Sequence, residues 1–250
     1  MKNIEPLVSI IMPAHNAEKY IRQSIQSVIN QSYQNWELII TDDASTDRTL
    51  EVIESFNENR IQILKLTQNA GAAVARNTSI ERAKGDFMAF LDSDDLWHKD
   101  KLAKQIAFMQ DNKISFSSTE YANIDENGQL INITKNHDQL DYDGILKYCP
   151  GNSTVIYNTK QLGKFYIPNI RKRNDFVMWL QVIKSAQILY GLREPLTYYR
   201  VREDSLSIDK KSLIKYQWQV YRDIEHLSLA KSLGLLVHKV LTVIFDLNKK

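Results

Sequence analysis

Acidic and polar side chains follow each of the first four apolar segments of the chain. The richest cluster reads Asp-Ser-Asp-Asp at residues 92–95, and an Asp-Asp pair stands at residues 42–43. Carboxylates gathered at one edge of a sheet repel one another unless a cation joins them. Hard oxygen ligands suit Mg²⁺ or Mn²⁺, which usually also bind substrate phosphates. The alternative is structural, because residues 92–95 would also cap a helix expected near Lys99.

The segments around these clusters alternate between strand and helix patterns. Continuous apolar runs of strand length lie at residues 7–12, 37–41, 61–64 and 87–91. Helical patterns follow them at residues 20–29, 47–56, 72–83 and 102–109. This alternation is typical of a parallel sheet with helices on both faces, whose ligands bind beyond the carboxyl ends of the strands. We therefore predict an α/β fold with a mostly parallel sheet and a site at its acidic edge.

After residue 112 the pattern loosens. Strands are expected at residues 114–118, 153–157 and 196–200, and helices at residues 175–185 and from 212 onward. Leu, Val and Ile recur at spacings of three and four within residues 229–247, with lysines and a histidine among them. Such a basic amphipathic helix lies on an anionic membrane, or it packs on the enzyme's own body or on a second subunit. Both interpretations stay open.

The composition excludes several classes of protein. The chain has 250 residues, 43% of them hydrophobic, and a formal net charge of +2, which is typical of a globular protein. Residues 210–250 hold eight Lys or Arg against three Asp or Glu, so the rest of the chain is acidic. An acidic body with a basic tail does not indicate a nucleic-acid-binding protein and suggests an anionic surface near the tail.

Cysteine usage and the N-terminus predict a cytoplasmic protein. The single cysteine, Cys149, excludes an intramolecular disulfide and a cysteine-based zinc site. Residues 1–6 lack the apolar run of a signal peptide, and no apolar stretch reaches the roughly 18–20 residues of a membrane span. Walker and GxGxxG motifs are absent, so phosphates would be held by a metal and by scattered basic side chains.

Four motifs carry a resemblance to a known family. They lie at residues 8–21, 41–49, 69–77 and 90–97 and read VSIIMPAHNAEKYI, TDDASTDRT, NAGAAVARN and FLDSDDLW. In this order and spacing they resemble the family 2 glycosyltransferases, which are inverting enzymes of the GT-A fold with nucleotide-sugar donors. The resemblance implies a Rossmann-like GT-A domain over residues 1–208, followed by a C-terminal helical extension over residues 209–250.

The resemblance also assigns the nucleoside site. It implies a turn along the nucleoside that consists of Pro13, Ala14, His15 and Asn16. Asp42 would accept a hydrogen bond from the uracil imide, which favours a UDP-sugar as donor. Asp43 and Asp47 are interpreted as turn and cap residues.

The diphosphate and its cation fall to the third and fourth motifs. Arg76 would approach the diphosphate, or it would order the acidic edge through an ion pair. Asp92, with Ser93 beside it, would meet the ribose. Asp94 would bind the Mn²⁺ or Mg²⁺ that bridges the diphosphate, with Asp92 as a second metal ligand. A cation there stabilises the negative charge that builds on the departing UDP.

Inversion needs a base that deprotonates the acceptor hydroxyl as it attacks. The candidate is Asp175, at the start of an apolar helix, where the family usually has Glu-Asp and this chain has Asn174 in place of the Glu. Without the resemblance, Asp175 would be interpreted as the N-terminal cap of that helix. Cys149 is interpreted as a bystander, because inversion forms no covalent intermediate. Asn152 is a weaker candidate for the sugar or acceptor site.

The chain lacks the Gln-x-x-Arg-Trp motif of relatives that make long polymers. The segment YYRVREDSLS at residues 198–207 resembles a loop of nonprocessive bacterial members instead. In that loop, Arg200 or Arg202 would close over the diphosphate.

Together these residues predict a metal-dependent, nonprocessive hexosyltransferase. It would move one galactose or glucose from a UDP-sugar to a glycan or lipid-linked acceptor during synthesis of a lipopolysaccharide, O-antigen, capsule or similar bacterial surface polysaccharide. The tail would add peripheral membrane contact or a homodimer interface. One alternative is a catalytically silent nucleotide-sugar-binding subunit, which would not need Asp94 and Asp175 together. A nucleotidyltransferase would have a glycine-rich basic loop after the first strand, and this chain has none there.

Overall fold

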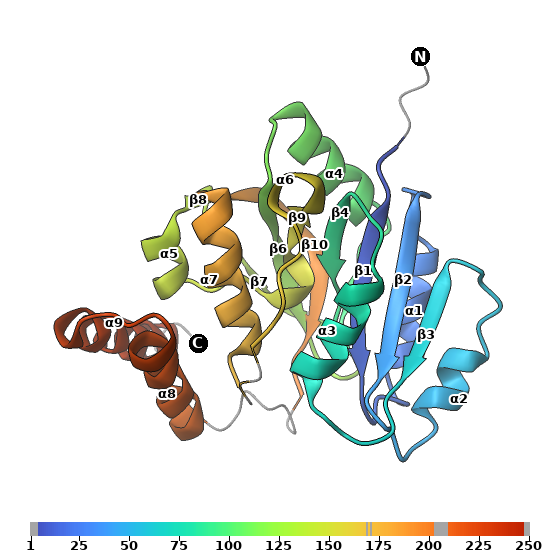
Figure 1. Cartoon of the computed structure of the whole chain (residues 1–250), viewed down its shortest axis with the longest axis horizontal. Helices are drawn as coiled ribbons and strands as arrows, with labels where there is room; N and C mark the ends of the chain where they lie inside the picture. The colour runs from blue at the N-terminus through green and yellow to red at the C-terminus, as the bar shows by residue number, and fades with distance from the viewer. Residues whose placement is uncertain (1–4, 169, 171, 203–209, 248–250) are drawn as a thin grey trace.

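The computed structural model describes residues 5–168, 170, 172–202 and 210–247. In this part of the chain the strands form one sheet in the order β3-β2-β1-β4-β9-β6-β10-β5, with β7 beside β6 and β8 beside β10 (Figure 1). The strands are β1 (Val8–Ala14), β2 (Trp36–Asp42), β3 (Ile61–Lys65), β4 (Phe87–Phe90), β5 (Leu96–Trp97), β6 (Phe116–Ile124), β7 (Leu130–Thr134), β8 (Gln139–Leu140), β9 (Ile156–Asn158) and β10 (Leu189–Arg200).

The N-terminal strands pair in parallel in the order β3-β2-β1-β4. Parallel neighbours need crossover connections, which α1, α2 and α3 supply. This arrangement brings the carboxyl ends of β1, β2 and β4 to one edge of the sheet. The helices are α1 (Ile21–Ile29), α2 (Thr49–Glu54), α3 (Ala72–Arg82), α4 (Lys101–Asp111), α5 (Tyr142–Lys147), η1 (Asn152–Thr154), α6 (Thr159–Leu162), α7 (Asn174–Ala186), α8 (Lys210–Gln219), η2 (Val220–Ile224) and α9 (Leu229–Leu247).

Each face of the sheet has its own hydrophobic core, because successive side chains of a strand point to opposite faces. Ile10 of β1 belongs to a core with Ile25 of α1 and Ile106 of α4. The next residue, Ile11, belongs to the core on the other face, with α3 and with Trp179 of α7. The prediction of an α/β sheet covered on both faces is therefore confirmed.

Beyond residue 112 the sheet is mixed rather than purely parallel. The short strand β9 pairs antiparallel with β4 and β6, and the long strands β6 and β10 pair in parallel. The register of β10 is irregular between Leu192 and Thr197, around Pro195. The sequence analysis did not predict β5, β7, β8, α5 or α6, and it predicted only the last residues of β10.

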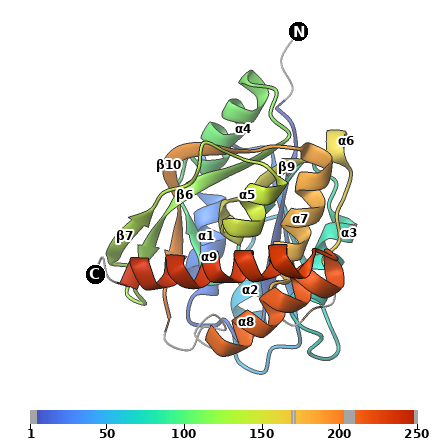
Figure 2. The ribbon, with the colours of Figure 1, turned by 90° about the vertical axis from the view of Figure 1, so that its left-hand side faces the viewer.

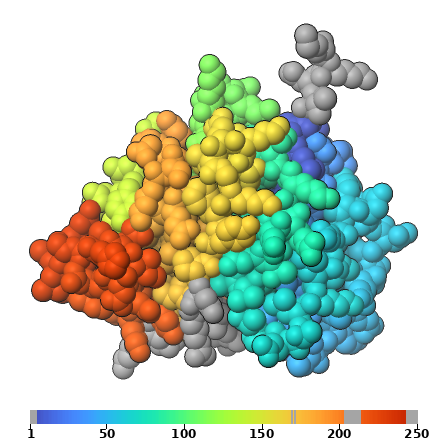
Figure 3. Space-filling view, in the orientation of Figure 1, coloured from blue at the N-terminus to red at the C-terminus, as the bar shows by residue number. Residues whose placement is uncertain are grey.

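The C-terminal helices α8 and α9 lie against one side of the body and form a lobe beside α5 and α7 (Figures 2 and 3). They share the main core, because Tyr221 and Leu235 are buried in the same cluster as Phe176. The Tyr221 hydroxyl donates to the carbonyl oxygen of Leu146 at 2.8 Å. One face of α9 therefore packs on the body. No helix within the described residues is long and apolar enough to cross a membrane.

Candidate active site

The turn after β1 lies beside the end of β2. Pro13 and Ala14 are the last residues of β1, and Ala14 is the register partner of Asp42. The next residue, His15, places Nδ1 2.8 Å from the carbonyl oxygen of Asp43. The residues that the resemblance assigns to the nucleoside, 13–16 and Asp42, therefore form one corner of the sheet edge.

Asp42 and Asp43 have different partners. The carboxylate of Asp42 accepts from the hydroxyl of Ser45 at 2.5 Å and from its N–H at 3.2 Å. Asp43 accepts from the N–H groups of Ala70 and Gly71 at 2.7 and 2.8 Å. Gly71 has a φ of +91°, which a side chain would strain. Asp43 thus holds the turn into α3, whereas Asp42 holds the loop after β2 through Ser45.

The two loops of this corner adopt a left-handed backbone at residues other than glycine. Asn16 has a φ of +47° and Ala44 a φ of +52°. The side chain of Asn16 accepts from the N–H of Thr46 at 2.9 Å. Asp47 accepts from the N–H of Thr49 at 2.9 Å and so caps the start of α2. Such strained positions persist where surrounding contacts hold them, often at functional sites.

Asp92 lies at the centre of the polar contacts after β4. Its Oδ1 accepts from Nη2 of Arg76 at 2.6 Å and from Nδ2 of Asn152 at 2.8 Å. Its N–H donates to Oγ of Ser153 at 3.1 Å. The short η1 helix thus contacts the predicted donor site, and Asn152, the weaker candidate for the sugar or acceptor site, binds Asp92 directly.

Asp94 and Asp95 are neighbours with different environments. Asp95 is buried and accepts from the hydroxyl of Ser153 at 2.5 Å and from the N–H of Arg200 at 3.0 Å. Asp94 lies 3.4 Å from Nε of Arg202. Burial and then the nearby carboxylates raise the pKa of both groups. Asp95 is therefore a structural residue, and Asp94 is the more accessible of the two.

Asp92 and Asp94 fit a divalent cation that shares its ligands with a diphosphate. The charge of Asp92 raises the pKa of Asp94, second only to burial, so a cation between them would relieve this repulsion. Within the described residues, no three Asp, Glu, His or Cys side chains gather into a complete metal site. Mg²⁺ usually keeps several waters and binds substrate phosphates, so a cation here would need only these one or two carboxylates from the protein.

Arg76 is a buried bridge between two parts of the site. One nitrogen donates to Asp92 at 2.6 Å, and the other terminal nitrogen donates to Oδ1 of Asn174 at 3.1 Å. Burial lowers the pKa of Arg76, but the charges of Asp92, Asp175 and Asp94 outweigh that effect and raise it. Both interpretations of Arg76 are compatible with this geometry, because the ion pair orders the acidic edge beside the predicted diphosphate.

Asp175 is the second residue of α7 and is half-buried. Arg173, at the position before the helix, has a left-handed backbone and makes no side-chain cap. Asp175 accepts no hydrogen bond from another described residue, so it forms no hydrogen-bonded cap. Its neighbour Asn174 accepts from Arg76, which also pairs with Asp92, and the charge of Asp175 acts on the Arg76 guanidinium. Its position in the first turn of α7 also suits the helix dipole, so the structure leaves both interpretations of Asp175 open.

Arg200 and Arg202 have different surroundings. Arg200 is buried and donates to the carbonyl oxygens of Asp94, Asp125 and Glu126 and to the side chain of Gln23. Its guanidinium thus uses its hydrogen bonds to fix the turn at Asp94. Arg202 lies closer to the predicted diphosphate, beside Asp94. Residues 203–207 of the predicted closing loop lie outside the described residues.

Ser153 is a residue that the sequence analysis missed. Its hydroxyl joins Asp92 to Asp95, and its carbonyl oxygen accepts from Nε1 of Trp97 at 2.8 Å and from Oγ1 of Thr197 at 3.1 Å. Nothing in the local sequence signals contacts with residues about sixty positions away. Cys149, close by, is buried, which raises the pKa of its thiol to about 12. It is not an activated nucleophile.

Comparisons with known proteins identify the family of this chain. A family model described as glycosyl transferase family 2 matches residues 9–171. The chain belongs to glycosyltransferase family 2. This glycosyltransferase is 42% identical over 236 residues to the putative teichuronic acid biosynthesis glycosyltransferase TuaG of Bacillus subtilis, with 93% of this chain and 94% of TuaG covered.

A second relative of this glycosyltransferase has a more specific name. Escherichia coli WfgD is named UDP-Glc:alpha-D-GlcNAc-diphosphoundecaprenol beta-1,3-glucosyltransferase. The two chains are 38% identical over 239 residues, which cover 95% of this chain and 94% of WfgD.

Solved structures show the same fold. TarS 1–349 from S. aureus, in complex with UDP-GlcNAc, has a TM-score of 0.71 at 23% identity and covers 93% of this chain and 71% of its own. Mannosyltransferase PcManGT from Pyrobaculum calidifontis, in complex with GDP-Man and Mn²⁺, has a TM-score of 0.69 at 16% identity and covers 95% of this chain and 70% of its own. The predicted GT-A fold of the glycosyltransferase is therefore confirmed.

Proposed function

We propose that this glycosyltransferase is an inverting, nonprocessive enzyme that transfers one glucose from UDP-glucose to a lipid-linked glycan. The observation that carries the proposal is the place of Asp175 in the first turn of α7, directly after Asn174, which accepts from the same Arg76 that pairs with Asp92. Glucose is preferred to galactose because WfgD is named a UDP-Glc-dependent enzyme. That name, with the teichuronic acid of TuaG, supports a role in bacterial surface polysaccharide synthesis.

UDP would lie along the carboxyl ends of β1, β2 and β4. Residues 13–16 would flank the nucleoside, and Asp42 would accept from the uracil imide beside its contacts with Ser45. Asp92 would meet the ribose, with Arg76 holding its carboxylate in place. Arg202, beside Asp94, would pair with the diphosphate.

Asp94 and Asp92 would hold Mn²⁺ or Mg²⁺. The cation would stabilise the negative charge on the departing UDP. The binding of PcManGT to Mn²⁺ supports this choice of metal, as does the mutual repulsion of the two carboxylates. Arg76 limits that repulsion through its ion pair with Asp92.

Asp175 would act as the general base. It would take the proton of the acceptor hydroxyl while that hydroxyl attacks the sugar on the face opposite to UDP, which inverts the anomeric centre. The left-handed turn at Arg173 and the bond from Arg76 to Asn174 fix the first turn of α7, so the carboxylate is positioned before the substrate arrives.

The outer face of α9 would rest on the membrane that holds the acceptor. Five apolar side chains are exposed on this helix at spacings of three, four or one, and they are Leu229, Leu233, Val237, Val240 and Leu241. An apolar row of this kind binds the interfacial region of a bilayer. The contact would be peripheral and would bring the active site close to a lipid-linked glycan.

The test is UDP release from a panel of UDP-sugars without acceptor, in Mn²⁺ or in EDTA. Slow, metal-dependent release from UDP-glucose alone is expected. Release from a different sugar would change the donor. UDP binding without release from any sugar, even with a GlcNAc-diphosphate lipid present, would favour a catalytically silent subunit. No UDP binding at all would overturn the donor site.

A further inference from the structure

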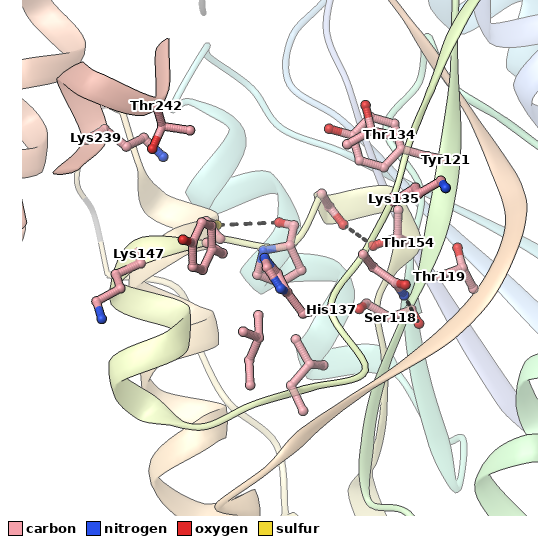
Figure 4. Close-up of a pocket in the computed structure, with 17 residues that line it drawn as sticks. Ser118, Thr119, Tyr121, Thr134, Lys135, His137, Lys147, Thr154, Lys239 and Thr242 are labelled. Carbon is pink, nitrogen blue, oxygen red and sulfur yellow. Dashed lines mark hydrogen bonds between the residues drawn. The ribbon is translucent and has the colours of Figure 1, made fainter. Parts of the chain in front are cut away.

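A cavity of about 320 Å³ lies beside the candidate active site. It is bounded by the β6–β7 hairpin on one side and by α9 on the other, with residues 147–151 between them (Figure 4). Figure 4 shows Lys239 and Thr242 of α9 facing Tyr121 and Thr134 of the two strands across the open space. Neither the donor site nor the general base uses these residues.

The cavity has cationic side chains and lacks acidic ones. Lys135, Lys147 and Lys239 line it, and no Asp or Glu belongs to its lining. None of these three ammonium groups forms an ion pair with a described residue, whereas Lys231 on the same helix α9 pairs with Asp143. Burial lowers the pKa of Lys239, and an anion in the cavity would reverse that effect. These features indicate an anion-binding site.

Two residues of the cavity lining also carry a buried oxygen atom without a hydrogen-bond partner in the described part of the chain. Within the described residues, Oγ1 of Thr119 and Oδ1 of Asn136 lack a hydrogen-bond partner, and both residues line the cavity. Buried polar atoms are rarely left without a partner. The hydroxyl and amide side chains of the lining, beside its lysines, suit a ligand with hydroxyl groups next to its anionic group, such as a glycosyl diphosphate.

The cavity is connected to the general base. Its wall includes Cys149 and Gly151, directly before Asn152, which donates to Asp92. Burial raises the pKa of Cys149 and lowers that of Lys239, and the charge of Asp175 has a smaller upward effect on each. A group bound in the cavity therefore lies within electrostatic range of Asp175, on the side of α9.

The same helix separates the cavity from an apolar surface. Lys239 and Thr242 face inward, whereas Val237, Val240 and Leu241 are exposed by 57%, 44% and 47%. A molecule with an anionic group and a long hydrocarbon chain matches both surfaces of α9. Neither a free anion nor a neutral sugar would use the outer one.

We propose that this cavity binds the diphosphate of the lipid-linked acceptor. Lys239 pairs with the diphosphate, Lys135 and Lys147 stand at the rim, and the hydrocarbon chain leaves along the outer face of α9. The glycan next to the diphosphate then presents its hydroxyl to Asp175. This inference rests on the proposed function and names the acceptor subsite of that same site.

The test compares two soluble acceptors that differ only in the diphosphate. They are the octyl diphosphate ester of α-N-acetylglucosamine and octyl α-N-acetylglucosaminide. The Lys239→Met variant should raise the KM for the diphosphate acceptor by about tenfold or more, because one charge-assisted contact is lost. It should leave the KM for the phosphate-free acceptor and the hydrolysis of UDP-glucose unchanged. Lys231→Met, on the same helix but outside the cavity, should change none of them.

Equal effects of Lys239→Met on both acceptors, or no effect on either, would overturn the subsite. If neither acceptor is glycosylated, calorimetric titration of the diphosphate ester into the UDP-bound protein decides, and absence of Lys239-dependent binding also overturns it. Failure of the proposed function looks different, because UDP binding and donor hydrolysis would then be missing before any acceptor is added.

Discussion

At the scale of single residues, two adjacent aspartates of the site make different contacts. The carboxylate of Asp95 accepts hydrogen bonds from the hydroxyl of Ser153 and from the backbone N–H of Arg200. The carboxylate of Asp94 lies 3.4 Å from Nε of Arg202, and the backbone carbonyl oxygen of Asp94 accepts a hydrogen bond from the Arg200 side chain. The fold thus fixes the turn through Asp95 and leaves Asp94 for a ligand.

The Asp94→Asn substitution tests that division. It should lower the affinity for UDP in Mn²⁺ by about 10- to 100-fold, because a charged metal ligand is lost. The fold should persist, since the contacts of Asp95 stay in place. Calorimetric titration with UDP measures the difference, and in EDTA the two proteins should bind alike. Unchanged affinity in Mn²⁺ would remove Asp94 from the metal site.

Asp175→Asn tests the base with a side chain of nearly the same shape. We expect sugar transfer to fall by about 10²–10⁴-fold, the usual contribution of a general base. UDP affinity should stay the same, because the contacts that hold Asp92 come from Arg76 and Asn152 and do not involve Asp175. Single-turnover transfer and UDP titration provide the two readings. Transfer at the wild-type rate would assign the proton to another group.

At the scale of elements, α4 begins with an unusual buried residue. Lys101 is fully buried, and its amine lies 3.8 Å from the ring centroid of Trp97 in β5. Its Nζ has no hydrogen-bond partner among the described residues. Burial lowers its pKa well below the usual value. Burial therefore disfavours the protonated amine in the folded protein relative to the unfolded chain.

Lys101→Met should raise the free energy of unfolding at pH 7 by about 1–3 kcal/mol, because it removes an unpaired buried polar atom. The unfolded chain binds a proton at Lys101 below pH 10.5, and the folded protein does not until a lower pH. Wild-type stability therefore falls as the pH drops from 10.5, so the benefit of the substitution is larger at pH 7 than near pH 10.5.

Urea unfolding at both pH values measures this benefit. Lys104→Met, on the exposed side of the same helix, is the control and should show no benefit that grows toward pH 7, because the hydrogen bond and ion pair with Glu194 raise the pKa of Lys104 instead of lowering it. An equal benefit of Lys101→Met at pH 7 and pH 10.5 would mean that the amine stays charged in the folded protein.

The elements of the N-terminal half could be predicted because each strand there is a continuous apolar run between helical repeats. The later strands lack that signal. In β7, Leu130, Ile131 and Ile133 are all exposed, so burial does not impose an alternating pattern. In β10, the irregular register around Pro195 interrupts the strand pattern.

The residues of the candidate site likewise differ in whether a local sequence pattern signals them. Asp92, Asp94 and Arg76 stand in local motifs at the ends of predicted elements, and the fold brings them together. Ser153 and Asn152 contact Asp92 across about sixty residues of chain. Such contacts depend on the pairing of β9 with β4, which no local pattern encodes.

At the scale of the whole molecule, α9 has two faces with separate uses. Leu235 is buried in the core, and Lys231 pairs with Asp143, so the helix is anchored to the body. The other face exposes Leu233 by 49% and Val237 by 57%. The predicted choice between packing and membrane contact is thus not exclusive, because one helix has a surface for each.

Replacing Leu233 and Val237 together by Glu should abolish binding to vesicles with anionic phospholipid, because two apolar side chains worth about 1.5–3 kcal/mol each on burial are lost. The fold should stay intact, since both side chains are exposed. The control adds the same charge at the far edge of the sheet, with Asn57→Glu and Gln62→Glu, and should keep binding. Cosedimentation measures both. Retained vesicle binding, with loss of a dimer in analytical ultracentrifugation, would make this face a subunit interface instead.

The continuity of the sheet has a consequence for motion. Strands β9, β6 and β10 extend the sheet directly from β4. The carboxylates of the proposed UDP-sugar site and the cavity beside β6 therefore lie on one continuous hydrogen-bonded sheet. Hinge closure needs two bodies joined by a few yielding residues, and the described strands offer no such joint between the two binding regions. The proposed donor and acceptor sites would therefore keep a fixed separation on one sheet. The substrates, and not the sheet, would have to change conformation to bring the reacting groups together.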